Sequence, residues 1–206
     1  MKNLIELYKK ESNDAFTSID TASIADFTTL IIKAYTNENK VFACGNGGNV
    51  ASVQNLVLDL NMHPFVSEDK SARKGGRNKF QAISLCDSGA AITGITNDLG
   101  FDKIFSEQLK YQASKGDILF AMSGSGNSGN VIEALKVAKE FGMICVVMTR
   151  GKDTKSDEYA DLVLRINSTP STFPGQTGGN NNNFHYISKV SHIAVGILKQ
   201  YVENEN

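Results

Sequence analysis

The chain has 206 residues, which suits one α/β domain with a core large enough to be stable without disulfides or a structural metal. Its 21 Lys and Arg residues nearly balance its 22 Asp and Glu residues, and the charges are scattered, which argues against a nucleic-acid-binding surface. No segment has the roughly 18 consecutive apolar residues that a membrane span needs, and the first residues lack the apolar stretch of a signal peptide. We therefore expect a cytoplasmic protein with no membrane contact.

Residues 1–38 place apolar side chains at helical spacing and predict two amphipathic helices. Residues 39–206 contain five short apolar runs of strand length, at 41–44, 82–86, 118–122, 144–148 and 162–166. Segments with helical spacing separate most of these runs. This alternation predicts a single α/β domain over residues 1–206, built on a doubly wound, mostly parallel five-stranded sheet with helices on both faces and preceded by the two helices.

The loop GNGGN at 45–49 follows the first predicted strand and precedes a helix. Its backbone N–H groups can bind an anion, and its polar side chains can form hydrogen bonds with a hydroxylated ligand. The candidate ligand-binding residues here are Asn46, Gly47 and Asn49.

Asp59 lies on the helix that follows this loop, on one polar stripe with Ser52 and Asn55. We expect its carboxylate to lie near the loop ends, where it would be a candidate general base. The alternative interpretation is a charge on the helix surface or a buried ion-pair partner.

A second polar loop, SGSGNS at 123–128, joins the third predicted strand to a helix. Backbone N–H groups and the positive end of the helix dipole meet there, and the hydroxyl and amide groups add neutral donors. The sequence therefore predicts a phosphate-monoester site, and the alternative is a plain turn with a serine cap. The residues of this site are Ser123, Gly124, Ser125, Asn127 and Ser128.

Gly124, Gly126 and Gly129 also spell G-x-G-x-x-G, a pattern known from dinucleotide sites. Such sites usually carry the pattern at the first strand-to-helix turn, with an acidic residue about 20 positions further on. Here the pattern lies past the middle of the chain, and the next predicted strand ends at Arg150. An NADP-dependent reductase remains an alternative function.

The last predicted helix, Phe184–Val202, places His185 and His192 on one face. A histidine titrates near neutrality and can donate a proton to a sugar oxygen, although a histidine on such a helix is more often structural. His63, which precedes Pro64 in a loop, has no comparable argument. The role of His185 stays open.

Three further polar residues follow the second predicted strand and its helix: Asp87, Asn97 and Asp98. They either bind sugar hydroxyls or act as cap and turn residues. Residues 167–183 predict a long loop. The three cysteines have no paired spacing and are expected to be buried reduced thiols.

These features together resemble the SIS-fold phosphoheptose isomerases, which interconvert sedoheptulose 7-phosphate and an aldoheptose 7-phosphate. The likeness covers almost the whole chain. It includes the two leading helices, Cys44–Gly48 (CGNGG), Thr96–Asp98 (TND), Gly116–Leu119 (GDIL), the serine loop and a late histidine.

The resemblance implies that the serine loop binds the phosphate, that Asp59 matches the family's glutamate base, and that His192 matches its acid. It also implies a homotetramer with shared active sites. Zinc-binding members use a histidine and a glutamine at positions that correspond to Asn55 and roughly Phe184, so no metal or other cofactor is predicted. A non-catalytic sugar-phosphate sensor or regulatory partner is the alternative function, because the base is one methylene shorter.

Overall fold

The computed structural model describes residues 1–73, 80–167 and 180–204, and residues 180–187 by their backbone only. Its sheet has five strands in the order β2-β1-β3-β4-β5, and all four pairings are parallel. The strands are β1 (Lys40–Gly45), β2 (Gln81–Ser84), β3 (Ile118–Met122), β4 (Ile144–Thr149) and β5 (Leu162–Arg165). The predicted fold class is confirmed, and the sheet is wholly parallel in this part of the chain.

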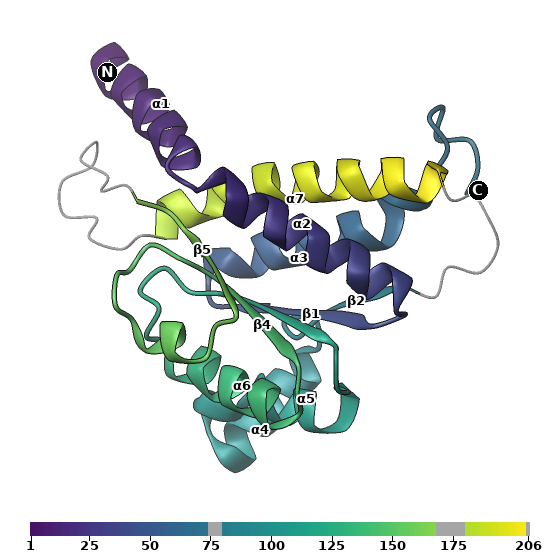
Figure 1. Cartoon of the computed structure of the whole chain (residues 1–206). Coiled ribbons are helices and arrows are strands. Elements are labelled where there is room, and N and C mark those ends of the chain that lie inside the picture. Colours follow the sequence, from purple (N-terminus) through teal and green to yellow (C-terminus); the bar gives the residue numbers. More distant parts are fainter. Residues whose placement is uncertain (74–79, 168–179, 205–206) are drawn as a thin grey trace.

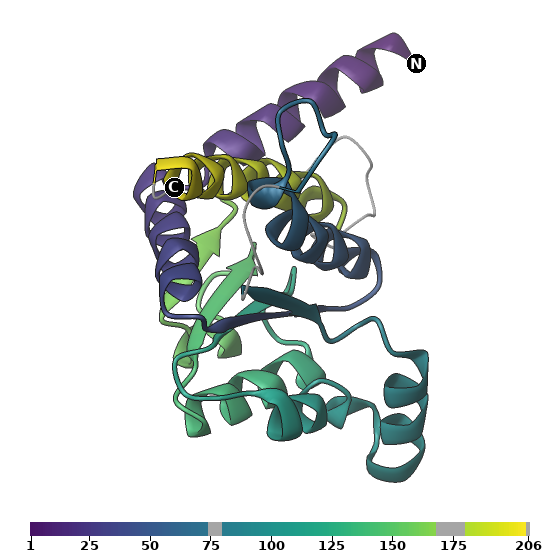
Figure 2. The same ribbon diagram turned by 90° about the vertical axis from the view of Figure 1, so that its right-hand side faces the viewer.

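Helices cover both faces of the sheet (Figures 1 and 2). One face carries α2 (Thr21–Thr36), α3 (Gly48–Met62) and α7 (Asn180–Asn204), and α1 (Lys2–Thr17) extends from this layer. The other face carries α4 (Gly89–Leu99), α5 (Ser106–Gln112) and α6 (Gly129–Glu140). The loop predicted over 167–183 is corrected at its end, because α7 begins at Asn180, and residues 168–179 lie outside the described residues.

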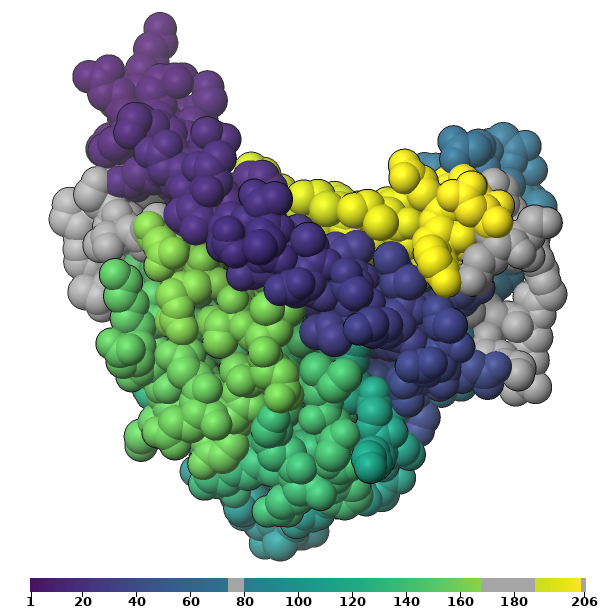
Figure 3. Space-filling model, viewed as in Figure 1, coloured from purple at the N-terminus to yellow at the C-terminus, as the bar shows by residue number. Residues whose placement is uncertain are grey.

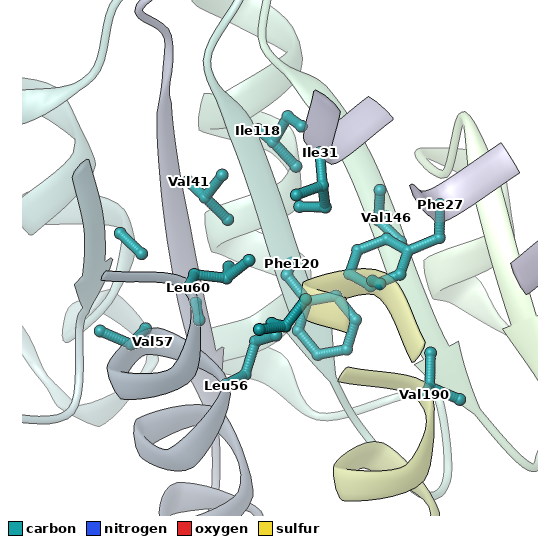
Figure 4. Close-up of a cluster of buried hydrophobic side chains, with 14 of the residues drawn as sticks. Phe27, Ile31, Val41, Leu56, Val57, Leu60, Ile118, Phe120, Val146 and Val190 are labelled. Carbon is teal, nitrogen blue, oxygen red and sulfur yellow. The ribbon is translucent and has the colours of Figure 1, made fainter. Parts of the chain in front are cut away.

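Two apolar cores hold these layers together. On the α2, α3 and α7 face, Phe27 packs on Phe120 of β3 with ring centroids 5.5 Å apart, and Leu56 and Val190 close the same cluster (Figure 4). On the other face, Phe42 of β1 belongs to a second buried cluster with side chains from β3, β4, α5 and α6. Burial on both faces explains why the strands read as continuous apolar runs without alternation.

The chain changes direction across the sheet between β1 and β3. These strands are neighbours, with Gly45 opposite Met122, and their following helices α3 and α6 leave toward opposite faces. Such a topological switch point is where open parallel sheets bind ligands, beyond the carboxyl ends of the strands. The GNGGN and serine loops both begin at this point.

Some apolar surface stays uncovered within one chain. Helix α1 stands out from the body, and its Leu4 and Ile5 side chains are about half exposed (Figure 3). Helix α4 has no buried residue. The described residues contain no helix that is long and apolar enough to cross a membrane.

Candidate active site

The serine loop folds tightly around its glycines. The Gly126 N–H donates to the Ser123 carbonyl oxygen at 3.1 Å, and Gly126 has φ +67°, which favours glycine. A Cβ atom at Gly126 would overlap the side chain of Thr154. Glycine is therefore required here by both conformation and space.

Two of the three hydroxyls of this loop face each other. Ser123 Oγ lies 3.1 Å from Ser128 Oγ, and Ser128 occupies the N-cap position of α6 without making a side-chain capping hydrogen bond. A serine cap therefore does not explain the loop. The first-turn N–H groups of α6 and the exposed Ser125 hydroxyl remain donors for an anion.

Asn127, a predicted ligand-binding residue, makes hydrogen bonds within the protein. Its Nδ2 donates to the Ser125 carbonyl oxygen at 3.0 Å, and its Oδ1 accepts from the Lys155 N–H at 3.1 Å. The side-chain amide thus shapes the loop and ties it to the turn after β4.

Two asparagines join the serine loop to the GNGGN loop. Asn46 Nδ2 donates to Asn130 Oδ1 and Asn130 Nδ2 donates to Asn46 Oδ1, both at 2.8 Å, and Asn130 is buried. The predicted ligand-binding residue Asn46 is thereby placed beside the serine loop. Asn49 is also buried, and its Oδ1 has no hydrogen-bond partner within the described ranges. The predicted residue Gly47 precedes α3 at its N-cap position with φ +57°.

A cavity of about 370 Å³ lies against the serine loop. Its lining includes Gly124 and Ser125 together with Arg150 and Lys152. These cations suit an anionic ligand. Sequence reasoning did not include Lys152 or Asn130 in the site, although Asn130 lies two positions after the serine loop.

Asp59 is the centre of a second polar group. Its side chain is 4% exposed, with Oδ2 3.4 Å from His192 Nε2 and Oδ1 3.6 Å from His63 Nε2. Asn55 Nδ2 donates to Asp59 Oδ2 at 3.1 Å. The structure thus brings Asp59 and His192 together and excludes a surface charge. It also adds His63, which sequence reasoning set aside.

Helical geometry places this group far from the two loops. At about 1.5 Å of rise per residue, Asp59 lies roughly 16 Å along α3 from Gly48, where the helix leaves the GNGGN loop. The expectation that Asp59 lies near the loop ends is therefore wrong within one chain. The helix runs back along the sheet, and its last turn meets α7 and the 3-10 turn His63–Phe65.

The side chain at position 55 does not fit the family's zinc site. Asn55 donates its Nδ2–H to Asp59, and a neutral side-chain amide is not among the groups that usually bind zinc. The described side chains form no group of three or more His, Cys, Asp and Glu residues suited to a metal ion. Phe184 and His185 lie where only the backbone is described.

The remaining predicted residues engage in local contacts. Asp87 Oδ1 accepts from Gln54 Nε2 at 2.8 Å, and Asn97 Nδ2 donates to Asp98 Oδ1 at 2.8 Å. All three predicted residues are exposed. A role in sugar binding stays a prediction for each.

Known proteins share this fold and sequence pattern. Residues 8–150 match the SIS domain family. The phosphoheptose isomerase of Aliarcobacter butzleri is 38% identical over 143 residues, covering 68% of this chain and 71% of that protein. The chain belongs to the SIS-domain phosphoheptose isomerase family.

Other members of the phosphoheptose isomerase family match over a larger share of the chain. The Rhodospirillum rubrum phosphoheptose isomerase is 31% identical over 171 residues, covering 82% of this chain and 86% of that protein. The solved phosphoheptose isomerase from Neisseria gonorrhoeae has a TM-score of 0.70 and 25% identity, covering 95% of this chain and 94% of that chain.

Proposed function

We propose that this protein is an aldose–ketose isomerase that interconverts sedoheptulose 7-phosphate and a heptose 7-phosphate through an enediol. Family membership supports the sugar-phosphate class, since the relatives compared are phosphoheptose isomerases. The observation that carries the proposal is the reciprocal Asn46–Asn130 pair, which sets two anion-binding loops side by side at the switch point.

The serine loop holds the phosphate. Its hydroxyls and the first N–H groups of α6 donate to the phosphate oxygens, and Arg150 and Lys152 line the adjacent cavity. This end of the site provides affinity and position and takes no part in proton transfer.

Proton transfer takes place at the group around Asp59 and His192. An enediol mechanism needs a base that removes a proton from carbon and an acid that protonates the carbonyl oxygen, each within hydrogen-bond reach of the sugar. The group holds one carboxylate and two imidazoles, since His192 lies 3.4 Å and His63 lies 3.6 Å from Asp59, and both kinds of side chain can act as acid or base. We propose no metal in this step, because Asn55 replaces a ligand with an N–H donor.

The active site is completed by neighbouring chains in a homotetramer. A seven-carbon chain with about 1.5 Å per bond brings the sugar's carbonyl within roughly 9 Å of its phosphorus. That length is shorter than the roughly 16 Å from Gly48, where α3 leaves the GNGGN loop beside the serine loop, to Asp59. The difference supports a site whose two ends come from different chains. The exposed apolar side chains of α1 and the unburied α4 supply surface for subunit contacts.

We further propose a cytoplasmic location. All three cysteines, Cys44, Cys86 and Cys145, are free thiols, and a reducing compartment keeps thiols in that state.

Solvent exchange tests the reaction. The protein is incubated in deuterium oxide with sedoheptulose 7-phosphate, and NMR follows deuterium at the carbons next to the carbonyl and the appearance of an aldose phosphate. We expect both signals. Binding of the sugar phosphate without exchange would instead indicate a sensor. The matched control is Ser125→Asp, which puts a negative charge into the phosphate loop and abolishes binding.

A further inference from the structure

The two imidazoles beside Asp59 reach a cavity that the carboxylate does not reach. His63 and His192 line a cavity of about 730 Å³ between the 66–73 loop and α7, whereas Asp59 is absent from its wall. Their side chains are 56% and 61% exposed, against 4% for Asp59. A ligand in this cavity touches the histidines first, and the carboxylate lies behind them.

Each imidazole faces its own oxygen of this carboxylate. His63 approaches Oδ1 from the 3-10 turn after α3, and His192 approaches Oδ2 from α7. Asn55 also donates to Oδ2, which fixes the carboxylate plane. A buried carboxylate in this position orients the rings and stabilises whichever imidazole is protonated.

We propose that His63 and His192 are the acid–base pair of the isomerase and that Asp59 is a positioning residue that acts through both of them. The proposal rests on the isomerase function above. It changes the role that the sequence predicted for Asp59, and it gives His63 a catalytic role.

The proton balance closes with two imidazoles of opposite protonation state. The neutral imidazole takes the proton from the carbon next to the carbonyl, the C–H electron pair forms the C=C bond, and the imidazolium protonates the carbonyl oxygen. In the second half, the imidazole that has given up its proton takes the hydroxyl proton from the carbon that lost its hydrogen, and a new C=O bond forms there. The other imidazole, now protonated, returns its proton to the former carbonyl carbon. No net proton, electron or metal is required.

Charged groups from three elements face this pair. The 66–73 loop contributes Glu68, Lys70 and Arg73, and α7 contributes Lys199, which pairs with Glu68 at 2.7 Å. Asp59 is the contribution of α3. The described wall thus holds two cations, Lys70 and Arg73, beyond the Lys199–Glu68 pair.

Substitution of each histidine tests the pair. We expect His63→Asn and His192→Asn each to lower kcat about 100-fold or more, the usual weight of a general acid or base, with the calorimetric affinity for sedoheptulose 7-phosphate changed by less than about twofold. Added imidazole should restore part of the turnover of His63→Ala, because the position is open to solvent. Glu140→Gln, an exposed change on α6, is the control that keeps wild-type rates.

Asp59→Asn tests the positioning role. Removing the carboxylate that orients both imidazoles should lower kcat with KM little changed, and added imidazole should not rescue this variant. Two results would overturn the histidine pair but leave the isomerase function intact. One is full turnover in His63→Asn when the wild-type protein shows exchange. The other is failure of imidazole to rescue a His63→Ala variant that folds and binds substrate. Absence of exchange in the wild-type protein would overturn the isomerase function and the pair with it.

Discussion

The Asn46–Asn130 pair should contribute measurably to stability because it joins two loops by reciprocal hydrogen bonds. Each neutral hydrogen bond contributes about 0.5–1.5 kcal/mol net, so two bonds at 2.8 Å predict a coupling of about 1–3 kcal/mol. Asn46→Ala and Asn130→Ala should each cost about 1–3 kcal/mol, and the double variant should cost less than their sum by that coupling. Asn46→Ala also leaves the buried Asn130 amide without a partner.

Urea unfolding followed by far-ultraviolet circular dichroism measures these free energies, since the chain has no tryptophan. The matched control is Asn61→Ala, which removes a similar pair of bonds between α3 and Ala82 of β2. Asn61→Ala and Asn46→Ala should be additive because they share no partner. Additive effects for Asn46 and Asn130 would refute the reasoning, because they would mean that the loops are held together by other contacts.

Three other measurements follow from burial and charge. Phe120→Ala removes a fully buried ring and should cost about 3–5 kcal/mol, seen as a lower urea midpoint at an unchanged slope. Hydrogen bonds from Lys103 and then Lys136 lower the pKa of Glu133 from 4.5 to about 2, so the stability it contributes is present above 4.5 and lost as pH falls toward 2. The stability difference between wild type and Glu133→Gln should shrink over that range. Burial raises the pKa of Cys145 to about 12, so iodoacetamide at pH 8 should label it in the unfolded chain much faster than in the folded one, as mass spectrometry can show.

The fold was predictable from local patterns. The central strands β1, β3 and β4 are short apolar runs buried on both faces, as at Ile118–Met122, and glycine-rich loops mark the carboxyl ends of β1 and β3. The two loops are adjacent because β1 and β3 are neighbours in the sheet. An alternation of strands and helices along the sequence does not specify that strand order. Asn130 was therefore missed as a site residue, since its partner Asn46 lies 84 positions away.

The role of His63 and the location of Asp59 could not be predicted from the sequence pattern. A polar stripe on α3 correctly groups Asp59 with Asn55, but the stripe does not say which end of the helix faces the ligand. His63 follows Asp59 at helical spacing, yet Pro64 signals a loop, and the 3-10 turn that keeps the two side chains together is not visible in that signal. Tertiary contact between α3 and α7 then supplies His192.

Distance along α3 makes subunit sharing testable by complementation. Ser125→Asp disables the phosphate loop, Asp59→Asn disables the distant centre, and each variant alone should be nearly inactive. If every site takes its loop from one chain and its centre from another, equal coexpression should make about a quarter of the sites intact, because each half is intact with a probability of about one half. If one chain supplied both halves, every site would carry a defect and the mixture would stay inactive. From the roughly 16 Å that separates Gly48 from Asp59, we expect the coexpressed sample to recover toward a quarter of wild-type kcat. Separately purified variants that are mixed and assayed before their subunits exchange should show no recovery.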